Sequence, residues 1–260
     1  IVPLASRMVG AVLVTGGSKR IGREISLRLS KAGFSVCIHY NSSSDEATKL
    51  VREIKEMGGE ACALHCDLRN VESARSMIKE ISDSLGPLEG LVNNASLFKL
   101  DRIEDISQEN WNSHMEVNVL SPLVMISELS KKSTVGNSWV VNILDFKIES
   151  PNADYLSYTA SRFALHGLTS ALAIDLAPEI RVNAVAPGHI LTSDILSQDA
   201  LKKAQSMSLL GYGATPEDIA EAVLFLANSK SITGQTIFVD SGERMNQRRR
   251  DPALEGADES

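Results

Sequence analysis

The sequence predicts a single α/β domain built on a doubly wound parallel sheet. Short apolar runs rich in Val, Ile and Leu alternate along the chain with longer helical patterns, which is typical of parallel strands joined by crossover helices. The first of these runs ends in a glycine-rich turn that leads directly into a helix. The length of 260 residues suits one such domain with a large sheet.

Turn and cap residues set the bounds of the expected elements. A helix that begins near Ser44 ends at the glycines 58–59, because glycine readily terminates a helix. Thr215 and Pro216 match the cap and the first residue of a later helix. Strands are expected over 11–15, 35–40, 61–66, 88–92, 139–144, 180–186 and 236–240, and further helices over 70–84, 107–131 and 155–177.

The composition is typical of a soluble globular protein, with 43% hydrophobic and 23% charged residues. The net charge of −7 argues against a nucleic-acid partner. No apolar run approaches the ~20 residues of a membrane span, and the start lacks a secretory pattern. The three cysteines form neither a CxxC pair nor a zinc-binding spacing. We therefore expect a cytoplasmic protein with no metal site and no membrane partner.

The domain is expected to occupy residues 10–242. Residues 1–9 precede the strand pattern and are interpreted as an N-terminal extension. Residues 243–260 have no apolar periodicity, and the arginines 248–250 in this stretch are followed by acidic residues. Such a segment is predicted to be a flexible, solvated, charged tail.

The turn over residues 15–22 reads Thr-Gly-Gly-Ser-Lys-Arg-Ile-Gly. Glycine is needed where backbone turns tightly or approaches a pyrophosphate, and the helix that follows offers N–H groups and a positive dipole. Because this motif lies between a strand and a helix, it is stronger evidence for dinucleotide binding than a lone glycine turn. The residues predicted to bind a dinucleotide here are Gly16, Ser18, Lys19, Arg20, Ile21 and Gly22.

No acidic residue stands at the end of the second strand, where NAD-binding proteins place Asp or Glu on the ribose hydroxyls. This strand ends in His39 and Tyr40, followed by Asn41 and Ser42. An acid would repel a 2′-phosphate, whereas histidine, serine and the nearby Arg20 can donate hydrogen bonds to it. The sequence therefore predicts NADPH as the cofactor.

From about residue 10 to residue 242 the chain resembles the short-chain dehydrogenase/reductases, which have a Rossmann-type fold. The order and spacing of the matching motifs are jointly very specific. They are Thr15-Gly16 with Gly22, Asp67-Leu68, Asn93-Asn94-Ala95, Asn118, Tyr158 four residues before a basic residue, Pro187-Gly188 with Thr192, and Val239-Asp240.

This resemblance implies roles for residues outside the glycine turn. Asp67, with Leu68 after it, is implied to contact the adenine. Asn93 and Ala95 are implied to line the cofactor. The motif Pro187-Gly188, followed by Thr192, is implied to support the nicotinamide.

Within the family, four departures from the general pattern resemble the pteridine reductase branch. Arg20 stands where most members carry glycine, and the pair His39-Tyr40 ends the second strand. Ser96 replaces the last glycine of the usual Asn-Asn-Ala-Gly motif, and Phe98 follows it. Asp145 stands where most members place the catalytic serine. The resemblance implies reduction of a pterin or folate.

Each departure has a physical use in a pterin site. A flat heteroaromatic ring can lie between Phe98 and the nicotinamide, which sets the distance for hydride transfer. Ser96 and Arg20 can hydrogen-bond polar atoms of the substrate and the cofactor. Asp145 can join Tyr158 in delivering a proton to a ring nitrogen.

Tyr158 and Arg162 are four residues apart on an expected helix and therefore share a face. A cation beside the phenol is expected to move its pKa from ~10 toward neutrality. The family normally has lysine at this place, and arginine keeps the charge but cannot release a proton. The resemblance makes Asn118 a further catalytic residue.

Assembly is inferred from the resemblance alone. The long helices over 107–131 and 155–177 carry apolar rows that mostly indicate burial against the sheet. In the resembled family these helices also pair subunits, usually as tetramers, so a homotetramer is expected. The C-terminus of pteridine reductases can reach a neighbouring subunit's site, which suggests a ligand contact for one of the arginines 248–250.

Three functions stay open from the sequence. The first is NADPH-dependent reduction of a pterin or dihydrofolate. The second is a carbonyl reductase such as a 3-oxoacyl thioester reductase, although Asp145 lacks the hydroxyl that would position a carbonyl oxygen. The third is a cofactor-binding regulatory protein without turnover, which the replacement of lysine by Arg162 motivates.

Overall fold

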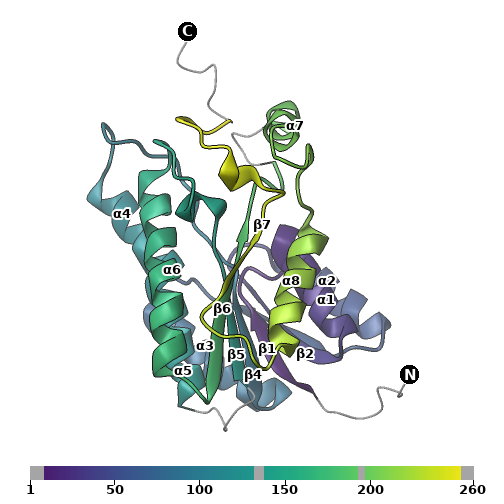
Figure 1. The fold of residues 1–260 in the computed structure, drawn as a ribbon. Helices are drawn as coiled ribbons and strands as arrows, with labels where there is room; N and C mark the ends of the chain where they lie inside the picture. The colour runs from purple at the N-terminus through teal and green to yellow at the C-terminus, as the bar shows by residue number, and fades with distance from the viewer. Residues whose placement is uncertain (1–8, 132–137, 193–196, 253–260) are drawn as a thin grey trace.

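A computed structural model describes residues 9–131, 138–192 and 197–252 of the chain. In these residues seven strands form one parallel sheet in the order β3-β2-β1-β4-β5-β6-β7 (Figure 1). The prediction of a single domain with a doubly wound parallel sheet is confirmed. The strands are β1 (Val9–Val14), β2 (Phe34–Tyr40), β3 (Ala61–His65), β4 (Leu88–Asn93), β5 (Ser138–Ile143), β6 (Ile180–Pro187) and β7 (Thr236–Val239).

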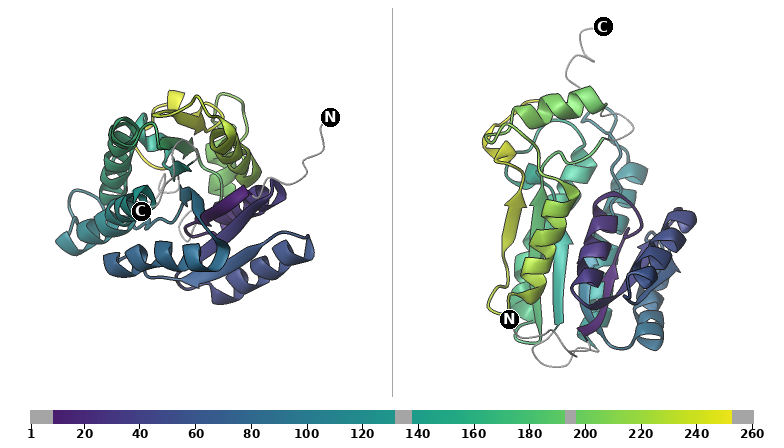
Figure 2. Two further views of the ribbon diagram at one scale, coloured as in Figure 1. Left: turned by 90° about the horizontal axis from the view of Figure 1, so that it is seen from below. Right: turned by 90° about the vertical axis from the view of Figure 1, so that its right-hand side faces the viewer.

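Helices cover both faces of the sheet, as the views in Figure 2 show. Helices α1, α2 and α8 pack on one face, and α3, α5 and α6 pack on the other. The α-helices are α1 (Arg20–Lys31), α2 (Ser44–Glu56), α3 (Val71–Leu85), α4 (Gln108–Met115), α5 (Ser121–Ser130), α6 (Leu156–Asp175), α7 (Gln198–Ser206) and α8 (Pro216–Asn228). Short helical turns are η1 (Glu116–Leu120), η2 (Phe146–Ile148) and η3 (Glu243–Met245).

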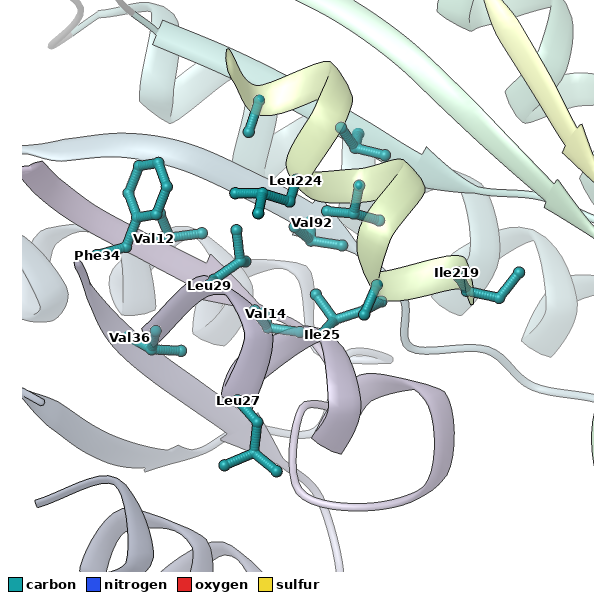
Figure 3. Packing of buried hydrophobic residues seen from close by; sticks show 14 of the residues in the cluster. Val12, Val14, Ile25, Leu27, Leu29, Phe34, Val36, Val92, Ile219 and Leu224 are labelled. Carbon is teal, nitrogen blue, oxygen red and sulfur yellow. The ribbon is translucent and has the colours of Figure 1, made fainter. Parts of the chain in front are cut away.

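The alternation of side chains along the central strand β1 builds both layers of the core. Val12 and Val14 point toward α1 and α8, where they join Ile25 and Leu224 in one apolar cluster (Figure 3). Leu13 points to the opposite face and packs in the cluster formed with α3 and α5. All five side chains are buried, and each such burial contributes about 1.5–3 kcal/mol. A strand buried on both faces reads as a continuous apolar run, which is why the sequence predicted it.

The long helix expected over 107–131 is interrupted. A π-helical turn, η1, separates α4 from α5. Asn118 lies in this turn, and its Oδ1 accepts a hydrogen bond of 2.8 Å from the Leu97 backbone N–H. Its Nδ2 donates to the Leu97 carbonyl at 3.0 Å and to the Ser161 hydroxyl at 3.0 Å. The wider turn brings Asn118 to these partners, and π-turns of this kind are frequent at functional sites.

The described part of the expected charged tail packs on the domain. After β7 the chain forms η3, and residues 243–252 lie above the carboxyl ends of the strands (Figure 1). Glu243 and Asp251 are buried because they pair with cations of the domain. Residues 243–252 therefore make specific contacts with the domain, whereas the flexibility of the tail stays a prediction, and residues 253–260 lie outside the described residues. Residues 1–8 of the expected extension lie outside them as well, and β1 begins at Val9.

Within the described ranges, no helix combines the length and the apolar character that a membrane span needs. In the same ranges, no group of three or more His, Cys, Asp or Glu side chains is arranged to hold a metal ion.

Candidate active site

A cavity of about 880 Å³ lies at the carboxyl ends of the central strands. It spans the point where the strand order reverses between β1 and β4, which is where open α/β sheets bind ligands. The predicted residues that it brings together are Gly16, Ser18, Lys19, Arg20, Ile21, Gly22, His39, Tyr40, Asn41, Ser42, Asp67, Leu68, Ala95, Ser96, Phe98, Asp145, Tyr158, Arg162, Pro187 and Gly188.

Three predicted residues do not line this cavity. Asn93 and Asn118 are buried behind it, where Asn93 Nδ2 donates to Asn142 Oδ1 at 2.8 Å. Thr192 is described but lies off the cavity wall, next to residues 193–196, which are outside the described residues. The implied cofactor contact of Asn93 stays a prediction, and the hydrogen bonds that the side chains of both asparagines make join segments behind the cavity wall.

The glycine turn has the close backbone approaches that its sequence predicts. Gly16 has a φ of +59°, which favours glycine. A Cβ on Gly22 would lie 2.2 Å from the Gly16 carbonyl oxygen, so no larger residue fits there. The turn leads into α1, whose N-cap residue Lys19 makes no side-chain cap hydrogen bond. The N–H groups at this helix end are therefore available to an anion in the cavity.

Arg20 opens α1 in an unusual backbone conformation. Its φ is +54°, in the left-handed region that residues other than glycine rarely adopt. Such a conformation costs on the order of 1 kcal/mol and is most often kept at functional sites. The side chain is exposed and lines the cavity. Lys19, by contrast, forms an ion pair of 2.8 Å with Glu46, so Arg20 is the cation of the turn that is best placed for phosphate.

His39 has a different role from the expected one. Its Nδ1 accepts a hydrogen bond of 2.9 Å from the Gly16 N–H, and its Nε2 lies 2.9 Å from the Cys66 carbonyl oxygen. Burial lowers the pKa of His39, so the neutral ring donates to Cys66 and accepts from Gly16. Both nitrogens are used within the domain, and His39 holds the glycine turn instead of donating to a phosphate.

Tyr158, which is buried, and Asp145, which is half-buried, form a pair at the other end of the cavity. The Tyr158 hydroxyl donates a hydrogen bond of 2.8 Å to Asp145 Oδ2. Asp145 Oδ1 accepts a second one, of 2.9 Å, from the Lys147 backbone N–H. Burial raises the pKa of Asp145, although Lys147 and the Tyr158 hydroxyl act in the opposite direction. Both oxygens of Asp145 thus accept hydrogen bonds, and one of them holds the proton of the Tyr158 hydroxyl.

The sequence predicts that Arg162 moves the pKa of Tyr158 toward neutrality, but in the structure this pKa is raised. Burial raises the pKa of Tyr158, and the Asp145 carboxylate adds to this, so that together they outweigh the Arg162 cation. The guanidinium carbon lies 4.8 Å from the centre of the tyrosine ring. Its Nη1 donates to the Ile143 carbonyl at 3.1 Å, and its Nη2 donates to the Ser96 hydroxyl. Arg162 thereby joins the ends of β4 and β5.

An aromatic wall stands beside the Tyr158–Asp145 pair. The Phe98 ring stacks on Tyr155 with 4.2 Å between ring centres and meets Tyr158 edge-on at 4.7 Å. Phe98 remains 42% exposed and lines the cavity. Tyr155 was missed from the sequence, and its left-handed backbone, with a φ of +61°, is visible only in the structure. His189 and Asp251 also line the cavity and were missed.

The site fits a bound dinucleotide. The glycine turn leaves room for backbone to approach a pyrophosphate, and the end of α1 supplies N–H donors. Arg162 is only 3% exposed, yet its Nε has no hydrogen-bond partner among the described residues. A buried donor without an acceptor is costly, and a ligand hydroxyl in the cavity would satisfy it.

Comparison with known proteins gives the family. Residues 16–243 match the family model described as enoyl-(acyl carrier protein) reductase. The chain belongs to the short-chain dehydrogenase/reductase family. It is 32% identical to 3-oxoacyl-(acyl-carrier-protein) reductase FabG from Staphylococcus aureus, over 92% of this chain and 100% of that protein. This short-chain dehydrogenase/reductase is accordingly an oxidoreductase.

Solved structures of the family are also similar. FolM alternative dihydrofolate reductase 1 from Brucella canis, complexed with NADP, has a TM-score of 0.90 at 36% identity, over 95% of this chain and 99% of that one. A short-chain dehydrogenase/reductase from Serratia marcescens has a TM-score of 0.85 at 28% identity, over 92% of this chain and 100% of that one.

Proposed function

We propose that this chain is an NADPH-dependent reductase of a pterin or dihydrofolate-type substrate. The observation that carries the proposal is the hydrogen bond between Tyr158 and Asp145 beside the exposed ring of Phe98. Most members of the family have serine in place of Asp145, and a serine hydroxyl suits a carbonyl oxygen. A carboxyl group can instead carry a proton to a ring nitrogen.

Residues of the cavity wall would hold the phosphate groups and a ribose of NADPH. When bound, NADPH supplies a hydride to a ring carbon of the substrate. Arg20 and Ser42, both at the cavity wall, offer donors for the 2′-phosphate, and the N–H groups that open α1 would bind the pyrophosphate. The unpaired Nε of Arg162 offers a donor to a ribose hydroxyl. NADP in the Brucella structure supports this choice of cofactor.

Tyr158 and Asp145 hold the proton that the substrate nitrogen takes up. Burial and the Asp145 carboxylate raise the pKa of Tyr158, so the phenol keeps the proton that it shares with Asp145 until the substrate nitrogen takes it up. When a ring C=N bond becomes CH–NH, the nitrogen gains one proton and the pair is left with one fewer. The cation of Arg162, 4.8 Å from the centre of the tyrosine ring, offsets the negative charge that remains.

The aromatic wall orients a flat substrate. Phe98 is held by its stack on Tyr155, so its exposed face is presented at a defined place beside Tyr158. Stacking on a fixed ring limits the orientations of a heteroaromatic substrate, and such positioning accelerates a reaction. A linear acyl thioester has no flat ring to stack on Phe98, so this wall limits its orientations much less. Similarity to FolM supports the pterin or folate substrate, whereas similarity to FabG supports a 3-oxoacyl thioester.

Oxidation of NADPH by the purified chain tests the proposal. Dihydrofolate and dihydrobiopterin are compared with an acetoacetyl thioester, and we expect faster oxidation with a pterin-type substrate. Asp145→Ser should lower this rate about a hundredfold without weakening NADPH binding. Asp83→Ser, at an exposed site on α3, is the matched control.

Other outcomes assign the chain differently. Faster oxidation with the acetoacetyl thioester contradicts the proposal in favour of a carbonyl reductase. NADPH binding without oxidation by any of the three substrates indicates a cofactor-binding protein without turnover.

We further propose a homotetramer in the cytoplasm. Trp111 on α4 and Phe163 and Ile174 on α6 are large apolar side chains with 39%, 43% and 82% exposure. A second copy of the chain packed on these helices would remove this apolar surface from water. Light scattering of the purified protein gives the number of subunits, and a monomer would contradict the assembly without affecting the proposed chemistry.

A further inference from the structure

The C-terminal segment, residues 246–252, is joined to the loop over residues 146–155 that connects β5 to α6. The Ala153 N–H donates to the Arg249 carbonyl at 3.2 Å, and the Asp251 N–H donates to Asp154 Oδ2 at 2.9 Å. Asp154 is completely buried and pairs with Arg250 at 3.2 Å and with Arg102 at 3.0 Å. Buried charges with several partners are placed specifically, since each depends on the others to offset its desolvation.

Lys147 is the residue of this loop that meets Asp251. It is 1% exposed and Asp251 is 3% exposed, and Lys147 Nζ lies 3.0 Å from Asp251 Oδ2. The same ammonium donates to Asn152 Oδ1 at 3.1 Å. An ammonium buried this completely needs a carboxylate partner, and Asp251 provides it from a part of the chain 104 residues away.

Lys147 also contacts both functional parts of the substrate end. Its backbone N–H donates to Asp145 Oδ1, and its Nζ lies 4.7 Å from the centre of the Tyr155 ring. Tyr155 in turn supports Phe98. One buried lysine therefore contacts the carboxyl group of the proton-carrying pair and the ring behind the aromatic wall.

We infer that Asp251 is a positioning residue of the active site, which acts through Lys147 to hold Asp145 and Tyr155 in place. The C-terminal segment is then a part of the substrate end of the cavity, contributed by the same chain. The inference rests on the proposed function in one respect, namely that it takes Asp145 as a carrier of the proton.

His189 extends this network. Its Nδ1 lies 2.6 Å from Glu243 Oε1, and its Nε2 lies 3.7 Å from Asp251 Oδ1. Burial lowers the pKa of His189, but Asp251 and Glu243 outweigh burial and raise it to about 9. The charged groups near His189 are Glu243 from η3, Asp251 from the C-terminal segment and Asp145 from the end of β5. Lys147 faces the other oxygen of Asp251.

Asp251→Asn tests the inference, because it keeps the shape of the side chain and removes the charge that pairs with Lys147. With whichever substrate the wild type reduces, we expect kcat to fall about tenfold and the KM for NADPH to stay unchanged. We also expect the alkaline limb of the pH profile to move toward neutral pH, since His189 loses one of its two carboxylates. Asp251→Glu should recover part of kcat.

Hydrogen exchange gives a readout that does not depend on turnover. In Asp251→Asn we expect faster exchange of backbone amides over residues 145–155, with unchanged exchange over β1 and α1. Asp83→Asn, at the exposed site on α3, should behave as the wild type in every measurement.

Two outcomes would overturn the inference. One is a kcat and an exchange pattern over 145–155 equal to those of the control. The other is faster exchange throughout the domain, which would reduce Asp251 to a general contributor to stability. If exchange rises only over 145–155 but the wild type reduces no pterin or folate, the positioning role stands and the proposed substrate fails.

Discussion

The two ends of the cavity are built in different ways. At the cofactor end, the lining residues come from the stretches 16–22 and 39–43 at the ends of β1 and β2, and the glycine turn is shaped by close backbone approaches at Gly16 and Gly22. At the substrate end, the loop over residues 146–155 is held by a C-terminal segment about a hundred residues away, through the buried Lys147–Asp251 pair and the pair of Arg250 with the buried Asp154. The cofactor end therefore depends on local backbone geometry, and the substrate end depends on long-range electrostatics.

This difference predicts separable effects of mutation. Changes in the Tyr158–Asp145 pair or in the C-terminal network should affect turnover and leave cofactor binding intact. Changes in the glycine turn should weaken cofactor binding itself, because Gly22 has no room for a side chain.

The largest effect is expected from Tyr158→Phe. Removal of the hydroxyl that donates to Asp145 should lower kcat about a thousandfold, the size of a lost general-acid contribution. NADPH affinity, followed by fluorescence titration, should stay the same because the phenyl ring remains beside Arg162. Tyr212→Phe, at a tyrosine that is exposed after α7, is the control. Full activity of Tyr158→Phe would remove the residue from the mechanism.

Replacement of His189 is expected to have a smaller effect, which is a loss in the free energy of unfolding. The folded pKa of about 9 lies above the unfolded value of roughly 6.5. Protonated His189 therefore stabilises the fold fully below pH ~6.5, and this contribution is lost as the pH rises through about 9.

Urea unfolding of His189→Gln measures this contribution. The variant should lose about 1–3 kcal/mol of unfolding free energy near pH 6 and much less near pH 10. His65→Gln, at an exposed histidine on β3, is the control. An equal loss at both pH values would show that the network does not depend on the histidine charge.

The smallest effect is expected from Arg162→Lys. An ammonium keeps the charge, but it cannot reproduce the planar fork that reaches both the Ile143 carbonyl and the Ser96 hydroxyl. We expect kcat to fall about tenfold. The double variant Ser96→Gly/Arg162→Lys restores the pair that most family members carry and should recover most of the loss. Undiminished activity of the single variant would show that the charge alone is sufficient.

Much of the fold was predictable because its signals are local. The apolar runs of the buried strands, the glycines at helix ends and the cap at Thr215 each act within a few residues, and the structure has the capping box there. The π-turn at Asn118 was not predictable, since it depends on hydrogen bonds to Leu97 and Ser161 from other segments. A continuous helical pattern gives no sign of it.

For the site, the sequence predicted which residues come together, but it did not predict the environment of each side chain. The motif residues Asp145, Tyr158 and Arg162 meet at one cavity because β5 ends and α6 begins at the same edge of the sheet. The role of His39 could not be read from its type, because it depends on which backbone groups face its two nitrogens. The raised pKa of Tyr158 likewise reflects burial, which outweighs the neighbouring cation.

The sequence by itself determined the doubly wound sheet and the glycine turn, because periodicity and turn residues are properties of short stretches of chain. The family resemblance pointed to Asp145 and Tyr158 as residues of one site. Only the tertiary structure decided that the charged C-terminal segment belongs to the site. Free in water, Asp251 and the arginines beside it would be solvated charges. In the structure Asp251 is buried against Lys147, and Arg250 pairs with the buried Asp154, since the low polarity of the interior makes each buried charge depend on its counterion.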